Sequence, residues 1–148
     1  GLIFLEPGDE VIAANPSFVR YKSATLLSNA KLVEVQLGAD LRHDLPKMLA
    51  AITPRTRLIF VCNPNNPTGT VLSRTEFEQF LVAIPDDICV VLDEAYFELA
   101  QDEPDPINSL DYIRPVGTWS ASGPSARSQG LQVSESATAS PLRTSWTR

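Results

Sequence analysis

The sequence predicts an α/β fold with a mostly parallel sheet, and three observations lead to this prediction. Two continuous apolar runs, Leu58–Cys62 and Ile88–Leu92, are bounded by Pro, Gly and Asn, which is typical of strands buried on both faces of a parallel sheet. About 25 residues separate them, which is enough for the crossover that parallel strands need. Polar residues follow each run, at the sheet edge where open α/β sheets bind ligands.

The residues before the first of these runs supply two further strands and two helices. After a turn at 6–9, residues 10–14 predict a short strand, and Asn15-Pro16-Ser17-Phe18 opens an amphipathic helix that runs to about Asn29. Residues 30–37 mix apolar and polar positions, which favours a strand at an edge of the sheet. Residues 45–52 carry their apolar side chains on one side and predict a helix.

A third helix is expected between the two apolar runs. Ser73 and Glu76 form a Ser-x-x-Glu pattern, which is typical of a capping box at a helix start. The helix should reach about Ile84 and bury Phe77, Phe80 and Leu81. The chain would then return through Pro85-Asp86-Asp87 to the next strand.

Polar motifs lie just past both apolar runs. Asn63-Pro64-Asn65-Asn66-Pro67-Thr68-Gly69 follows the first run, and Asp93-Glu94-Ala95-Tyr96 follows the second. We therefore expect Asn66 and Asp93 to face one crevice. Each motif alone also suits a surface turn or a helix N-cap, but two motifs at a compatible spacing are a much stronger signal than either one.

These two motifs resemble those in the large domain of fold-type I pyridoxal-phosphate (PLP) aminotransferases of class I/II. Their residues are most similar to those of histidinol-phosphate aminotransferases. The resemblance implies part of a three-layer α/β/α PLP-binding domain. It implies that Asn66 and Tyr96 bind the phenolic oxygen of PLP and that Asp93 pairs with its pyridine nitrogen. It also implies that Phe18 stacks on the cofactor, with Tyr21 as the alternative to Phe18; ordinary core packing is the competing interpretation of Phe18.

The chemistry of PLP accounts for these residue types independently. Because PLP works as an electron sink, its ring nitrogen must stay protonated, and a partly buried carboxylate such as Asp93 holds that proton through a charge-assisted hydrogen bond. Such a bond contributes roughly 1.5–3 kcal/mol. Asn66 and Tyr96 supply neutral donors to a phenolate-like oxygen.

The overall composition excludes several classes of partner. The chain has 148 residues, 43% of them hydrophobic, and a net charge of −6, which argues against nucleic acid or an anionic membrane as partner. No apolar run reaches the roughly 18 residues of a membrane span. Cys62 and Cys89 fall in predicted buried strands and indicate core thiols in a reducing compartment, not a disulfide or a metal site. His43, Arg55 and Arg57 are expected to be solvated.

The last part of the chain differs from the rest. Residues 116–148 are rich in serine and show no periodicity, so we expect residues 1–115 to form a partial PLP-binding domain and 116–148 a disordered tail. All three lysines, Lys22, Lys31 and Lys47, precede Asp93, whereas the family places a Schiff-base lysine about thirty residues after it. No catalytic residue is therefore assigned.

We hypothesise that an out-of-frame tail accounts for the missing lysine. One permitted set of codons for residues 117–130, read from the third base of the first codon, encodes a strand ending in Ser-Lys at the place where the family has it. The same shift carried to residue 139 gives the family's Leu-Ala-Gly-x-Arg-x-Gly-Tyr segment. The resemblance covers about residues 2–115, and we expect the family's N-terminal part and C-terminal small domain to be absent.

The resemblance implies a PLP-dependent enzyme that exchanges an amino group between glutamate and imidazole-acetol phosphate in histidine biosynthesis. It also implies a cytoplasmic homodimer whose substrates are amino acids and 2-oxo acids. Aminotransferases for aspartate or aromatic amino acids, and a threonine-phosphate decarboxylase, are the alternatives within the family. Outside the enzymes, the chain would be an inactive remnant that binds PLP weakly. A nucleotide- or flavin-binding module is disfavoured, because no Gly-x-Gly-x-x-Gly or Walker loop follows a predicted strand.

Overall fold

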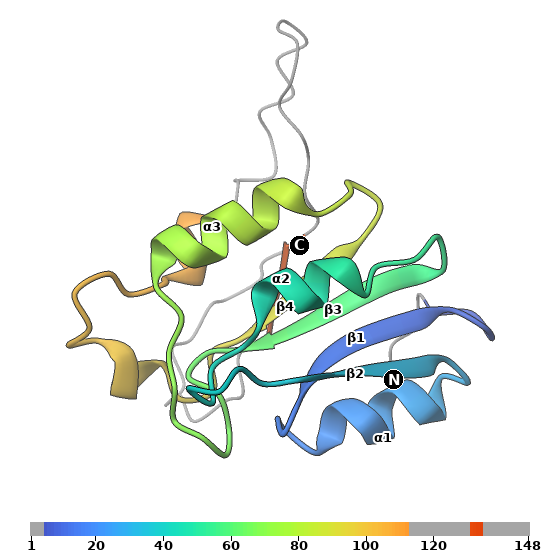
Figure 1. The fold of residues 1–148 in the computed structure, drawn as a ribbon, viewed down its shortest axis with the longest axis horizontal. Helices are drawn as coiled ribbons and strands as arrows, with labels where there is room; N and C mark the ends of the chain where they lie inside the picture. Colours follow the sequence, from blue (N-terminus) through green and yellow to red (C-terminus); the bar gives the residue numbers. More distant parts are fainter. Residues whose placement is uncertain (1–4, 113–130, 135–148) are drawn as a thin grey trace, which may run out of the picture.

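The computed structural model describes residues 5–112 and 131–134, which include a parallel five-stranded sheet (Figure 1). The strands lie in the order β2-β1-β3-β4-β5, and every neighbouring pair is parallel. Their bounds are β1 Glu10–Asn15, β2 Lys31–Gln36, β3 Thr56–Cys62, β4 Cys89–Asp93 and β5 Leu131–Ser134. The four strands expected from the sequence are all present, and β2 lies at an edge as its mixed pattern predicts.

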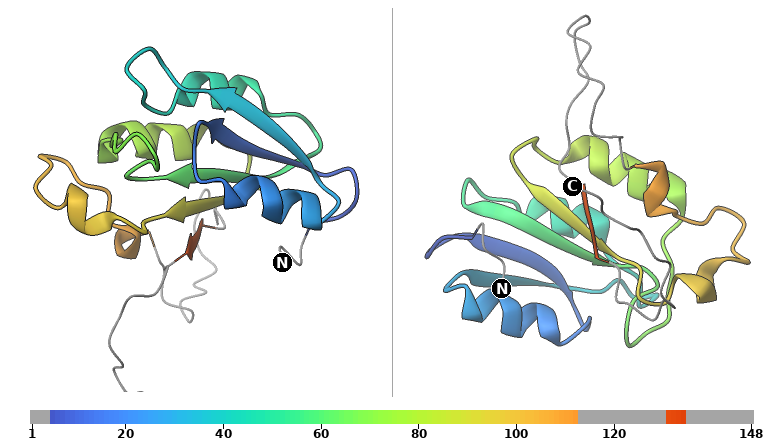
Figure 2. Two further views of the ribbon diagram at one scale, coloured as in Figure 1. Left: turned by 90° about the horizontal axis from the view of Figure 1, so that it is seen from below. Right: turned by 180° about the vertical axis from the view of Figure 1, so that it is seen from behind.

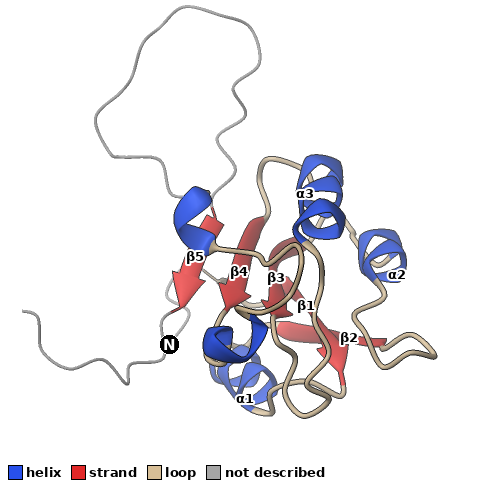
Figure 3. Cartoon of the chain, turned by 90° about the vertical axis from the view of Figure 1, so that its left-hand side faces the viewer, coloured by secondary structure: helices blue, strands red, loops and turns tan. Residues whose placement is uncertain are grey.

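Within the described residues, three α-helices cover the two faces of this sheet. They are α1 (Arg20–Leu27), α2 (Leu45–Ala50) and α3 (Arg74–Ala83), and two short 3₁₀ helices follow β4, η1 (Phe97–Ala100) and η2 (Ser109–Asp111). Figures 2 and 3 show α1 on one face and α2 with α3 on the other. The predicted three-layer α/β/α arrangement is confirmed. None of the helices in the described ranges is long and apolar enough to span a bilayer.

Alternate residues of the central strands point into two separate cores. In β3, Ile59 and Val61 join the core beneath α2 and α3, whereas Leu58 and Phe60 join the core beneath α1. All four are at most 6% exposed. This burial on both faces explains why the strand is continuously apolar instead of alternating. The same alternation between the two cores sets the direction in which residues at the carboxyl end of the strand point.

The expected capping box starts α3. The Ser73 hydroxyl accepts a hydrogen bond from the Glu76 backbone N–H, and the Glu76 carboxylate accepts one from the Ser73 backbone N–H at 2.9 Å. Arg42 reaches the same carboxylate from the loop before α2, with Nη1 at 3.0 Å from Oε1. The Arg42 guanidinium lowers the pKa of Glu76 to about 2. The box therefore also joins α3 to the loop before α2.

Strand β5 departs from the expectation for the end of the chain. Residues 131–134 pair in parallel with β4, from Val90 opposite Leu131 to Asp93 opposite Ser134. The expectation of disorder is wrong for these four residues, because β4 would otherwise present an unpaired edge whose backbone groups need partners. The other residues from 113 onward lie outside the described residues, and they include Ala126 and Arg127, whose codons the missing lysine codon would straddle. The division at 115/116 therefore stays a prediction.

Candidate functional site

Strands β3 and β4 bring the two polar motifs together at the carboxyl edge of the sheet. Cys62, the last residue of β3, pairs with Asp93, the last residue of β4. The Asn63 backbone N–H then donates to the Asp93 carbonyl at 2.9 Å. The two loops therefore leave the sheet side by side, as the parallel topology predicts.

Asn65 ties the loop after β3 to the end of β1. Its Oδ1 accepts a hydrogen bond from the Ser17 hydroxyl at 2.8 Å, and its Nδ2 donates to the Pro16 carbonyl at 3.2 Å and to Thr68 Oγ1 at 2.9 Å. Asn65 is only 1% exposed, so these bonds satisfy a buried amide. Gly69 ends the loop with φ +71°, a conformation that L side chains rarely adopt. Asn65 is thus a structural residue, whereas the side chain of the adjacent Asn66 turns to Tyr96 instead.

Asn66 and Tyr96 meet across the two loops. The Asn66 Nδ2 donates to the Tyr96 hydroxyl over 3.4 Å, which is long for such a bond. Tyr96 is 44% exposed, and its hydroxyl hydrogen remains available to another acceptor. Two neutral donors from different loops therefore converge where the sequence places them.

Asp93 is a buried carboxylate that forms no ion pair within the described part of the chain. It is 7% exposed, its Oδ2 accepts a hydrogen bond from the Tyr21 hydroxyl at 2.7 Å, and its Oδ1 accepts one from the Ala95 backbone N–H at 3.1 Å. No lysine, arginine or histidine among residues 5–112 forms a salt bridge with it. Buried charges in proteins are ordinarily paired, so this carboxylate is suited to a cationic ligand.

The aromatic residues of the β1–α1 corner differ in what their rings contact. Tyr21 stacks on Phe60 with ring centroids 4.2 Å apart and planes 8° apart, and Phe18 meets the Tyr21 ring edge-on at 5.6 Å. Tyr21 is 7% exposed, while Phe18 is only partly buried. Since Phe60 already covers one face of Tyr21, Phe18 remains the candidate for stacking on a ligand.

The contact between Tyr21 and Asp93 was not predicted from the sequence. The two residues are 72 positions apart, and the sequence suggests Tyr21 only as an alternative stacking ring. One signal was available: Tyr21 follows Phe18 by three residues, a spacing that puts both on one side of a helical turn.

His43 is buried, so the expectation that it is solvated is wrong. It is 7% exposed and its Nε2 donates to the Cys62 carbonyl over 2.8 Å. Its Nδ1 has no hydrogen-bond partner among the described residues. The surrounding sequence is polar and gives no sign of this burial, which places a donor beside the last carbonyl of β3.

We expect acid to destabilise the fold through His43. Burial lowers the pKa of this imidazole, so the unfolded chain binds the proton more readily than the folded chain. The free energy of unfolding should then be constant above about pH 6.5 and fall below it, by at most ~1.4 kcal/mol per pH unit. Urea unfolding at a series of pH values measures this slope.

The matched variant is His43→Gln, which retains a donor for the Cys62 carbonyl but does not titrate. Because His43 is the only histidine in the chain, the variant should lose most of the slope between pH 6.5 and 5.5. An equal slope in both proteins would contradict this role of His43.

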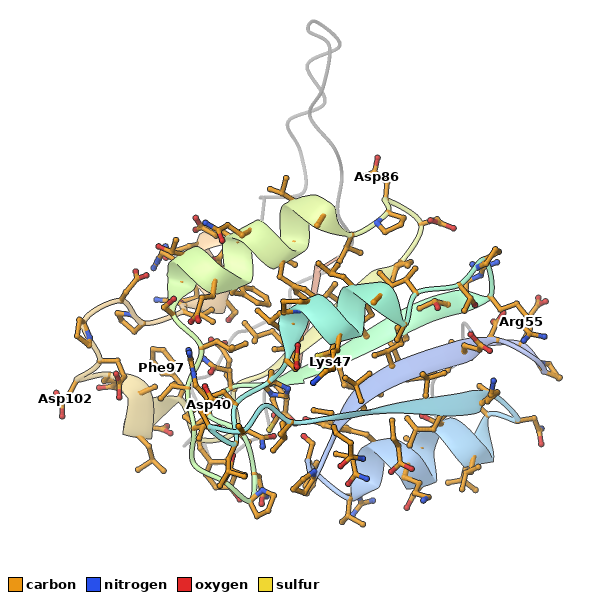
Figure 4. All side chains as sticks on the ribbon, in the orientation of Figure 1. Asp40, Lys47, Arg55, Asp86, Phe97 and Asp102 are labelled. Carbon is orange, nitrogen blue, oxygen red and sulfur yellow. The ribbon has the colours of Figure 1, made fainter. Side chains whose placement is uncertain are left out.

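The basic side chains are engaged elsewhere. Arg55 and Lys31 both bind the buried carboxylate of Glu10, at 3.2 and 3.0 Å, and the Arg55 side chain is also 67% exposed to solvent. Figure 4 shows Arg55 at the opposite end of the sheet from Phe97, which follows the Asp93–Tyr96 motif. The other two lysines pair with Glu34 and Asp44. No group of three or more potential metal ligands occurs within the described residues.

Comparison with known families accounts for this arrangement. Residues 1–122 match the family "Aminotransferase class I and II". The chain belongs to the class I and II aminotransferases. The resemblance read from the two motifs is therefore confirmed at the level of the family, and the roles of the individual site residues stay predictions.

The relatives of this aminotransferase chain carry more than one substrate name. It is 59% identical over 100 residues to an aromatic amino acid aminotransferase of Rhodococcus jostii, which covers 68% of the chain and 28% of the relative. It is 47% identical over 111 residues to a histidinol-phosphate aminotransferase of Moorella thermoacetica, which covers 75% of the chain and 28% of the relative. The chain thus spans less than a third of the length of these curated relatives.

A solved structure agrees with the fold. The histidinol-phosphate aminotransferase of Sinorhizobium meliloti, solved in complex with pyridoxal-5'-phosphate, superimposes with a TM-score of 0.60 and 29% identity. The superposition covers 64% of this aminotransferase chain and 26% of that one. The described sheet and helices therefore correspond to one part of a larger enzyme of this kind.

Proposed function

We propose that this chain holds the ring of PLP at the carboxyl edge of its sheet, as part of an enzyme that transfers an amino group from an amino acid to a 2-oxo acid. The observation that carries the proposal is the buried Asp93 carboxylate without a cation among residues 5–112. Burying an unpaired charge costs several kcal/mol. A protonated pyridine nitrogen supplies the missing positive charge.

The other residues of the site fit the same ligand. Asn66 and Tyr96 present neutral donors that suit the phenolic oxygen, and Phe18 presents an aromatic ring that suits one face of the pyridine. When bound, PLP supplies an electron sink for the carbanion that forms at the substrate. Asp93 keeps the ring nitrogen protonated, and the Asn66–Tyr96 pair polarises the phenolic oxygen without adding a full charge.

The proposal for the substrate comes from the relatives, because the site residues named above are all proposed to bind the cofactor. Two relatives support this step. The relative that is 59% identical is named for aromatic amino acids, and the relative that is 47% identical is named for histidinol phosphate. Both names denote a substrate with a flat ring in its side chain. We therefore propose an aromatic amino acid as substrate, with histidinol phosphate as the alternative, in a cytoplasmic homodimer of the kind that the family resemblance implies.

Saturable PLP binding by the purified chain tests the proposal. Equilibrium dialysis should show one site per chain for PLP and none for FMN or NAD, because no phosphate-binding glycine loop follows any of the described strands. Binding of FMN or NAD without any binding of PLP would contradict the proposal and favour a nucleotide-binding module.

The lysines support a second candidate, a remnant that binds PLP without covalent attachment. The chain contains Lys22, Lys31 and Lys47 only, and each pairs with a carboxylate. Borohydride reduction with PLP, followed by peptide mapping, should then label no single lysine preferentially. One dominant labelled lysine would exclude the remnant. Sequencing the DNA for residues 115–127 tests the proposed frame change directly.

A further inference from the structure

The phenol of Tyr21 is held in place from three sides. Its ring stacks on Phe60 at 4.2 Å, Phe18 packs against it edge-on, and its backbone carbonyl accepts a hydrogen bond from Thr25 Oγ1 at 2.8 Å. With ring and backbone both fixed, the hydroxyl has little freedom to leave Asp93 Oδ2, 2.7 Å away. The contact therefore comes from the packing of α1 on the sheet and is present before any ligand binds.

The hydroxyl can act only as a donor in this contact. Burial, together with the nearby Asp93 carboxylate, raises the pKa of the Tyr21 phenol, so the phenol carries its proton at neutral pH. Tyr21 thus supplies a hydrogen bond without adding charge.

Two donors fix the plane of the Asp93 carboxylate. Tyr21 donates to Oδ2 and the Ala95 backbone N–H donates to Oδ1, so each oxygen is anchored once. Each carboxylate oxygen can accept a second hydrogen bond. Because the two anchors come from different elements, α1 and the loop after β4, rotation of the carboxylate about its Cβ–Cγ bond would break both bonds.

We propose that Tyr21 is a positioning residue that orients Asp93 toward the protonated ring nitrogen of PLP. This inference rests on the proposed function. Without the Tyr21 hydroxyl, Asp93 retains its charge and its Ala95 anchor but rotates more freely, so the charge-assisted bond to the ring nitrogen weakens. Affinity for the rest of the cofactor stays the same, because Tyr21 reaches the ligand only through Asp93.

The test compares PLP with its deaza analogue, in which a CH group replaces the ring nitrogen. The ratio of the two dissociation constants isolates the contact between Asp93 and the ring nitrogen. The wild-type chain should bind PLP about tenfold or more tightly than the analogue, and Tyr21→Phe should reduce this preference about three- to tenfold. Affinity for the analogue should not change. Asp93→Asn should abolish the preference, and adding Tyr21→Phe to it should have no further effect.

Tyr96→Phe is the matched control. It also removes one hydroxyl from the site, but we assign that hydroxyl to the phenolic oxygen, so it should weaken binding of both ligands equally and leave their ratio unchanged. A wild-type ratio in Tyr21→Phe would overturn the positioning role while leaving PLP binding intact. Failure of the wild-type chain to prefer PLP at all would overturn the proposed role of Asp93, and the role of Tyr21 with it.

A second measurement needs no substitution. NMR of the wild-type chain, with labelled tyrosine and aspartate, should show a slowly exchanging Tyr21 hydroxyl proton coupled to the Asp93 carboxyl carbon. Absence of this proton in the folded chain would overturn the contact on which the inference depends.

Discussion

Replacing Asp93 by asparagine should weaken PLP binding about 10- to 100-fold, the effect of losing a hydrogen bond between charged groups. The substitution keeps the shape of the side chain and can retain the contact with Tyr21, so the fold should persist. Its free energy of unfolding should equal or exceed that of the wild-type chain, because the variant no longer buries an unpaired charge. Equilibrium dialysis and urea unfolding measure the two effects.

Asp87→Asn is the matched control for this substitution. Asp87 lies just before β4, at the other end of the strand, and its side chain is 73% exposed and pairs only loosely with Arg57, at 3.6 Å. Removing its charge should leave PLP binding unchanged. Equal losses of affinity in the two variants would indicate a general effect of net charge and would contradict a specific role for Asp93.

Replacing Phe77 by alanine should lower the free energy of unfolding by about 3–5 kcal/mol, the usual cost of emptying a buried aromatic site. Phe77 is fully buried between α3 and the sheet, and its ring meets Tyr112 edge-on at 5.7 Å. A loss of this size is a large fraction of the stability of a small domain. The midpoint of urea unfolding should therefore shift strongly to lower urea concentration.

Val82→Ala on the same helix is the control for this effect. Val82 is 71% exposed, so its truncation removes little buried surface and should change the free energy of unfolding by less than about 0.5 kcal/mol. Comparable losses in both variants would mean that α3 does not pack on the sheet as described.

The fold was predictable because each element carries its own signal. The continuous apolar run of β3 indicates a strand buried on both faces, and the mixed pattern of β2 indicates a strand at an edge of the sheet. Ser73 and Glu76 indicate where α3 starts. These signals are local, so a single sequence suffices to read them. β5 was missed because its four residues gain order from the exposed edge of β4, which lies far away in the sequence.

The site was predictable only in part. The two motifs place Asn66, Asp93 and Tyr96 at one sheet edge, since strands of a parallel sheet end on the same side. The support of Asp93 by Tyr21 and the burial of His43 were not predictable in this way. Both depend on how α1 and the loop before α2 pack on the sheet, and no local pattern encodes a contact between residues so far apart in sequence.

The central claim, that Asp93 holds the protonated ring nitrogen of PLP, is tested most directly by NMR of PLP labelled with ¹⁵N in its ring. Bound to the wild-type chain, the label should give the chemical shift of a protonated pyridinium at neutral pH, and bound to Asp93→Asn it should give that of a neutral pyridine. A neutral pyridine in the wild-type complex, or the same signal in both, would contradict the claim.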